Sequence, residues 1–140
     1  QYEQKSLFRF EAFQDYNVGD DGLDDQGMKD WCDFIEKKKK SGVKMERVRL
    51  VIEPLTEYTK SELIVHAKSK MFGDDIKTIN EVTFNKLSIP QEDFWLIDER
   101  LVLIMKYSES GEYLGFDIEE SDIKKYITTK DILIKHSLPL

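Results

Sequence analysis

The segment Arg47-Val-Arg-Leu-Val-Ile-Glu-Pro-Leu-Thr-Glu-Tyr58 decides the fold, because a strand pattern gives way at Pro54 to the start of a helix. Before the proline, alternation places Arg47 and Arg49 on the same face of the strand. A second segment, Asp93-Phe-Trp-Leu-Ile-Asp98, sets acids at both ends of another apolar strand. Charged side chains inside such strands need a partner or a function, because burying an unpaired charge is costly.

The composition fits one soluble domain without stabilising cross-links. The chain has 140 residues, of which 40% are hydrophobic and 35% charged. Its formal charge of -7 makes nucleic acid an improbable partner, since a phosphate backbone would be repelled. The basic run Lys37–Lys40 is interpreted as a solvated helix end, where cations suit the helix dipole.

Cysteine usage and hydropathy suggest a cytoplasmic protein. A single cysteine, Cys32, cannot form an internal disulfide and is expected to be a small buried side chain. The sequence shows neither a signal peptide nor a long apolar run, so no membrane association is expected. Because the chain starts at Gln1, an upstream segment stays an open alternative. We expect residues 1–27 to form an arm and an acidic loop, and residues 28–140 the compact core of a single domain.

Periodicity predicts a helix, strand, helix, strand order through the first half of the core. Gly19–Gly27 is rich in Asp and Gly and predicts a loop. Apolar residues from Met28 to Ile35 recur at helical spacing, and the strand spans residues 43–53. The next helix starts at Thr56 or Thr59. Its expected buried side consists of Leu63, Ile64, Ala67 and Met71, and a short strand follows near residues 76–82.

The C-terminal part reads as a β-meander followed by a helix. Strands are predicted at residues 94–97, 101–107 and 113–118, with Ser108–Gly111 as a hairpin loop. Ser121 and Asp122 begin the last helix. The fold class is therefore α+β, with a mixed and largely antiparallel sheet flanked by three or four helices.

Several side chains could carry chemistry, but none completes a motif. Arg47 and Arg49 could bind a carboxylate or phosphate, or pair with acids of their own fold. Tyr58, Glu62 and His66 follow at four-residue spacing, so a helix places them on one face. A Glu and a His so spaced could serve as metal ligands or as an acid and base, yet no third ligand is fixed. No metal or cofactor is therefore expected.

Six motifs are spread along the chain: Leu7-Phe-Arg-Phe-Glu11, Arg47-Val-Arg49, Pro54-Leu-Thr-x-Tyr58 with Glu62, Gly73-Asp-Asp-Ile76, Asp93-Phe-Trp-Leu-x-Asp98 and Met105-Lys-Tyr-x-x-x-Gly-x-Tyr-Leu-Gly115. In these motifs the chain resembles a bacterial family of uncharacterised single-domain proteins that is abundant in actinobacteria and often encoded near helix-turn-helix regulators.

The order of elements is also similar, more distantly, to one half of a phospholipase D-like domain. That family uses a His-x-Lys pair with an Asp five residues beyond the Lys. Aligning this Asp on Asp98 places Gln91 and Asp93 at the catalytic positions, so the resemblance implies a degenerate site without that chemistry.

These observations favour a non-enzymatic domain that senses a ligand or binds a protein, with a link to transcriptional regulation. The expected partner is a small anion or a protein, and the oligomeric state is left open. Two alternatives are a metal-dependent phosphodiesterase or nuclease-like hydrolase, and an acidic immunity or antitoxin-like protein. The candidate binding residues are Arg47, Arg49, Tyr58, Glu62, Asp93, Trp95 and Asp98.

Overall fold

A seven-stranded mixed sheet with helices on both faces forms the structure, a computed structural model that describes residues 4–14 and 25–140. The strands are β1 (Ser6–Glu11), β2 (Lys44–Val51), β3 (Asp75–Asn80), β4 (Phe94–Ile97), β5 (Leu101–Tyr107), β6 (Tyr113–Glu119) and β7 (Leu138–Pro139). The helices are α1 (Asp25–Lys40), α2 (Glu57–Lys70), α3 (Glu81–Asn85) and α4 (Ile123–Lys135).

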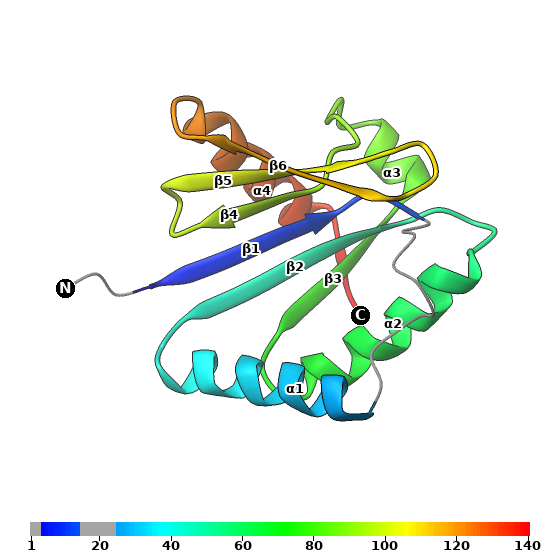
Figure 1. Ribbon diagram of the computed structural model, residues 1–140. Coiled ribbons are helices and arrows are strands. Elements are labelled where there is room, and N and C mark those ends of the chain that lie inside the picture. The colour runs from blue at the N-terminus through cyan, green and yellow to red at the C-terminus, as the bar shows by residue number, and fades with distance from the viewer. Residues whose placement is uncertain (1–3, 15–24) are drawn as a thin grey trace.

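The sheet joins a parallel half to an antiparallel half through β1 (Figure 1). The strand order is β6-β5-β4-β1-β2-β3-β7, in which β1 pairs parallel with β2 and antiparallel with β4. The predicted α+β fold and the C-terminal meander are confirmed. Strand β1, which falls within the expected N-terminal arm, is the central strand of the sheet and contributes Phe8 and Phe10 to the core.

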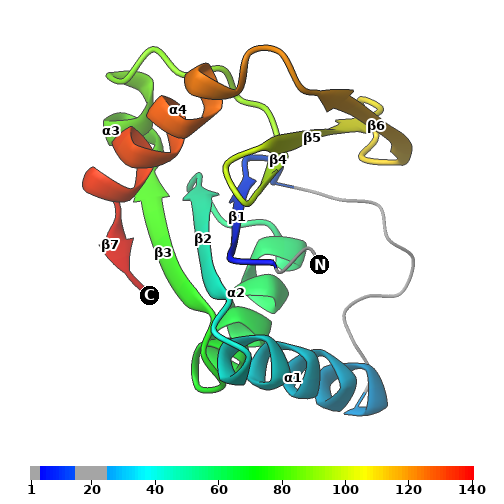
Figure 2. The ribbon, with the colours of Figure 1, turned by 90° about the vertical axis from the view of Figure 1, so that its left-hand side faces the viewer.

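Each face of the sheet has its own pair of helices (Figure 2). One face is apolar, and its residues pack with α3 and α4 into the main core, which includes Phe8, Phe10, Val48, Leu50, Phe94, Leu96, Val102, Tyr126 and Leu133. The other face packs against α1 and α2 and holds a smaller apolar cluster around Ile35, Val43 and Met45. Charged and polar side chains are also buried under these two helices, among them Glu11, Arg47, Arg49 and His66.

Helix α2 turns a polar face inward, contrary to the expectation from sequence. Thr56 caps it as expected, by accepting a hydrogen bond from the Thr59 amide. Its buried residues are Thr59, His66 and Ser69. Of the expected buried side, Ile64 is 62% exposed and Met71 is 82% exposed. The prediction was wrong because α2 packs over the charged strand face, where polar side chains find partners.

Other predictions have mixed outcomes. Cys32 is buried, and burial raises the pKa of its thiol above the ordinary value, so it is a poor nucleophile. The lysine run forms the last turn of α1, as expected. Helix α3 and strand β7 were not predicted. The Gly19–Gly27 loop lies for the most part outside the described residues, and α1 already begins at Asp25. Among the described helices, none combines the length and apolar character needed to cross a membrane.

Candidate functional site

Arg47 occupies the centre of the charged cluster beneath α1 and α2. Its guanidinium pairs with Glu11 from β1, and its Nε donates to Asp74 Oδ2 at 3.4 Å. The side chains of all three residues are at least 90% buried. The strand register explains the contact between Arg47 and Glu11. Strand β1 runs parallel to β2, and Glu11 lies opposite Arg49, which is two residues beyond Arg47 on the same strand face.

Arg49 and His66 converge on the other carboxylate oxygen of Glu11. Arg49 Nη1 lies 3.5 Å from Glu11 Oε2, and its Nη2 donates to the Thr59 hydroxyl at 3.3 Å. His66 Nε2 lies 3.5 Å from the same Glu11 oxygen. Glu11 therefore links β1, β2 and α2 through a single carboxylate.

Arg9 and Asp93 extend the cluster towards β4. Arg9 Nη2 donates to Asp93 Oδ2 at 3.0 Å. Asp93 Oδ1 accepts the backbone amides of Ala12 and Phe13 at 2.8 and 3.1 Å. Asp93 thus fixes the residues that follow β1 as well as the guanidinium of Arg9. These contacts account for a buried acid at this position.

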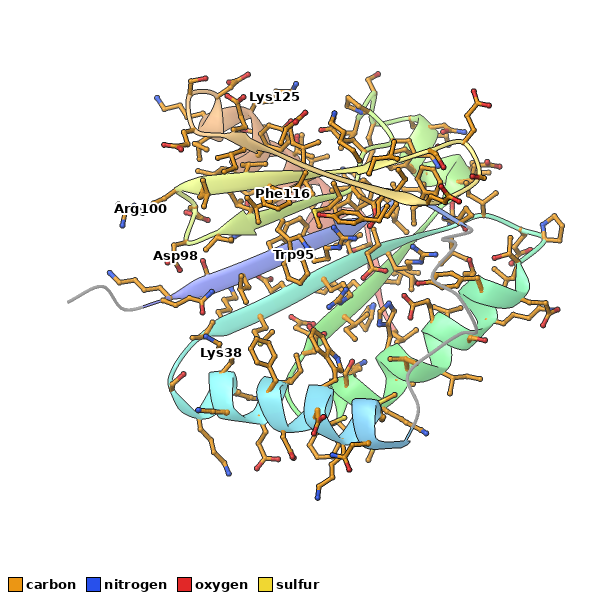
Figure 3. The ribbon with its side chains drawn as sticks, viewed as in Figure 1. Lys38, Trp95, Asp98, Arg100, Phe116 and Lys125 are labelled. Carbon is orange, nitrogen blue, oxygen red and sulfur yellow. The ribbon has the colours of Figure 1, made fainter. Side chains whose placement is uncertain are left out.

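Two tryptophans bring aromatic surface to the arginines. The Arg9 guanidinium carbon lies 5.3 Å from the Trp95 ring centre, and that of Arg47 lies 5.7 Å from both Trp31 and Trp95. Both rings are half-buried. Cation–π attraction is strongest when the cation is desolvated, so these contacts orient the guanidiniums. Figure 3 shows Trp95 near the middle of the sheet, on the side of α1.

Tyr58, Glu62 and His66 lie on one side of α2, as their spacing predicts. The Tyr58 hydroxyl donates to Glu62 Oε1 at 3.0 Å. Burial, followed by the charge of Glu62, raises the pKa of Tyr58 far above its ordinary value, so the hydroxyl stays protonated. Glu62, His66 and Glu11 each offer one ligand atom, and the three atoms lie within 4.8 Å of one another. This is the set of described residues that could hold a metal ion.

The pKa values of the buried acids and of Arg47 follow from burial and from the charges of their neighbours. Burial by itself raises the pKa of Glu11, but Arg47, His66 and Arg9 outweigh it and hold the pKa well below its ordinary value. Burial lowers the pKa of Arg47, whereas Glu11 and Asp74 raise it by more, so Arg47 stays charged. For Asp74, burial outweighs the effect of Arg47, and its pKa is raised. Glu11 is thus the acid on which the pairing depends most.

Asp98 lies apart from the other candidate residues. It stands in the β4–β5 turn, at the opposite end of β1 from Glu11, where Figure 3 shows it beside Arg100. Its Oδ1 accepts the amides of Lys5 and Ser6 at 2.6 and 2.8 Å, and its φ is 54°. An aspartate tolerates this left-handed conformation better than most residues. These contacts give Asp98 a structural role at the start of β1.

The cluster also contains residues that were absent from the candidate list, namely Arg9, Glu11, Trp31, Thr59, His66 and Asp74. The alternation Phe8-Arg9-Phe10-Glu11 carried a signal, because it places two charges opposite two phenylalanines on a strand. A helix stripe at 59, 62, 66 and 69 was a second signal, at helical spacing but of polar residues. Trp31 and Asp74 gave no comparable signal.

Among the residues that the structure describes, no helix covers the antiparallel half of the same sheet face. Helices α1 and α2 pack on β2 and β3, whereas β5 and β6 extend past both helices in Figure 2. The register places Phe116 opposite Met105, and Ile118 opposite Leu103, on this face. Strand β6 is an edge strand of the described sheet. Its large apolar residues are exposed: Tyr113 at 52%, Leu114 at 64%, Phe116 at 50% and Ile118 at 56%.

Comparison with known proteins gives a family and no activity. No curated protein matches the sequence. Residues 1–140 match the family described as "Domain of unknown function (DUF6879)". The match covers the whole sheet and all the residues of the charged cluster, so the chain belongs to the DUF6879 family, a domain of unknown function.

Proposed function

We propose that this domain is a non-enzymatic protein-interaction module that binds an extended segment of a partner protein along β6. The observation that carries the proposal is the exposure of an edge strand together with four large apolar side chains on it. Natural proteins usually protect such edges, because an unpaired strand invites pairing with another chain. Addition of a partner strand would bury this surface and satisfy the backbone groups of the edge.

The charge around β6 favours a basic partner. Residues 108–122 contain no Lys or Arg and carry six acids, Glu109, Glu112, Asp117, Glu119, Glu120 and Asp122. Lys106 from β5 reaches Asp117 at 3.5 Å, which offsets one of these charges. A second copy of the chain is a poor occupant, since pairing of two β6 edges would bring acidic rows together. A segment that alternates apolar and basic residues fits both the side chains and the charge.

A peptide of alternating valine and lysine, about as long as β6, tests the proposal. We expect its binding, followed by NMR, to perturb the β6 amides and to weaken by about tenfold when Phe116 and Ile118 are both changed to Ser. Met71→Ser is the matched control, because this residue is more exposed and lies on α2. A peptide with Glu in place of Lys should not bind. Equal binding of both peptides, concentration-dependent dimers through β6, or no perturbation of β6 would each reject the proposal.

Recognition of a small anion by Arg47 and Arg49 is less well supported by the geometry. The side chain of Arg49 has no exposed surface, and both guanidiniums already pair with Glu11. An anion would therefore have to displace a buried carboxylate. Changing both arginines to Gln tests this role, since unchanged folding with unchanged ligand capture would reject it. An immunity or antitoxin-like role would be one instance of binding to a basic protein, and a hydrolase would depend on a metal at Glu62 and His66.

A further inference from the structure

The approach of β1 to α2 brings a third possible ligand, Glu11, next to Glu62 and His66. Glu62 and His66 are one helical turn apart on α2, and Glu11 comes from the central strand. Imidazole and carboxylate donors together suit zinc and neighbouring first-row divalent cations. Two donors bound to a tetrahedral ion at about 2.0–2.2 Å lie roughly 3.4 Å apart. Glu11 Oε2 and His66 Nε2 are separated by 3.5 Å, which matches this spacing.

His66 Nε2 is buried, and no hydrogen bond to it is found among the described residues. His66 as a whole is 4% exposed. Its approach to Glu11 has the length of an ion pair without the alignment of a hydrogen bond. An unsatisfied buried nitrogen is rare and unfavourable, and a bound ion is one of its ordinary explanations.

The formal charges of the described cluster leave room for a cation. Three guanidiniums, those of Arg9, Arg47 and Arg49, face four carboxylates, those of Glu11, Glu62, Asp74 and Asp93. The carboxylates of the described cluster therefore outnumber its guanidiniums by one. The guanidiniums oppose a cation locally, but the excess acid and the low dielectric of the site favour an added positive charge.

Neighbouring side chains already hold the ligands in place. Tyr58 donates to Glu62, and Arg47 and Arg49 hold the carboxylate of Glu11. Such contacts around a metal site fix the orientation of its ligands and raise its affinity. We propose that Glu11, Glu62 and His66 bind a divalent cation of the zinc class. This site is independent of the β6 surface, so either proposal can fail without the other.

The test uses the whole chain, freed of metal with a chelator and titrated with Zn²⁺ and Co²⁺. We expect one ion per chain by calorimetry, a Tm higher by roughly 10 °C at a hundredfold excess over Kd, and a visible Co²⁺ spectrum of low coordination number. His66→Gln and Glu62→Gln should each weaken binding by at least about tenfold.

His136→Gln is the matched control, because this second histidine is exposed and caps α4. Circular dichroism of each variant checks that it folds, and the affinity is compared only among folded variants. Binding at more than one equivalent, or affinity unchanged in both His66→Gln and Glu62→Gln, would overturn the proposal. An NMR titration that shows a charged His66 at neutral pH without metal uptake would also overturn it, since a proton would then balance the cluster.

Discussion

The two halves of one sheet face differ in what they bury: the parallel half buries charged side chains, and the antiparallel half exposes apolar ones on its edge strand. Over β1, β2 and β3, helices α1 and α2 cover three buried arginines and their acids. Over β5 and β6, the same face carries apolar side chains that are half or more exposed on the last strand. Charge is buried on the part of the face that the two helices cover, and apolar side chains are exposed on β6 beyond them. A fold selected for stability alone would favour the reverse arrangement.

The difference locates the features that stability does not require. A buried charge network rarely stabilises more than well-packed apolar residues would, although it strongly disfavours the loss of one member. An exposed apolar edge contributes little to folding and adds a risk of aggregation. These two features underlie the two proposals, and each half can be tested by changes that leave the other half intact.

The largest effect is expected from Glu11→Gln. The change leaves Arg47 and Arg49 without their shared carboxylate, and loss of one partner from a buried network destabilises by about 3–5 kcal/mol. Urea denaturation measures it. Glu57→Gln is the control on the exposed start of α2 and should change stability by less than about 0.5 kcal/mol. Equal stability of the two variants would show that the buried half does not depend on its charges.

A pH series sharpens this result. Because the folded-state pKa of Glu11 is lowered, its contribution to stability is present above the unfolded-state pKa, about 4.3, and is lost as the pH falls towards the folded-state value. The stability difference between wild type and Glu11→Gln should therefore be constant near neutrality and shrink below about pH 4.3. A difference that grows on acidification would contradict the assigned charge of Glu11.

Asp98 tests the place where the two halves meet. Asp98→Ala removes the acceptor of the Lys5 and Ser6 amides and should destabilise by about 1–2 kcal/mol. Asp98→Asn keeps an acceptor and tolerates the positive φ, so it should lose less. Thermal unfolding of both variants measures the difference. If Ala were the milder change, the amide contacts would not be what holds the start of β1.

The smallest effect on stability is expected on β6. Phe116→Ser should change the free energy of unfolding by less than about 0.5 kcal/mol, because half of the side chain is already exposed. Leu96→Ala, on the covered face of β4, should cost about 2–5 kcal/mol. Chemical denaturation compares the two. A large loss in Phe116→Ser would mean that the open half is a core surface of this domain.

Local patterns predicted the elements and missed their environment. Alternation in Arg47–Val51 and the acids around Phe94 fixed two strands and the side on which their charges lie. The helix period of α2 was visible as well, but two stripes fit that period, one apolar and one polar. From hydrophobicity, the apolar stripe was predicted to face inward. In the structure the polar stripe faces inward, because α2 packs over the charged face of the sheet.

The sequence by itself determined the α+β class, the meander and the pairing of charge with apolar residues along β2 and β4, because these depend on side-chain alternation and turn residues close in the chain. The tertiary structure decided that Glu11, 36 positions before Arg47, is its partner, that α2 faces inward with its polar side, and that β6 is an exposed edge. These facts depend on strand order and helix placement, which arise from contacts between distant segments and leave no local pattern to read.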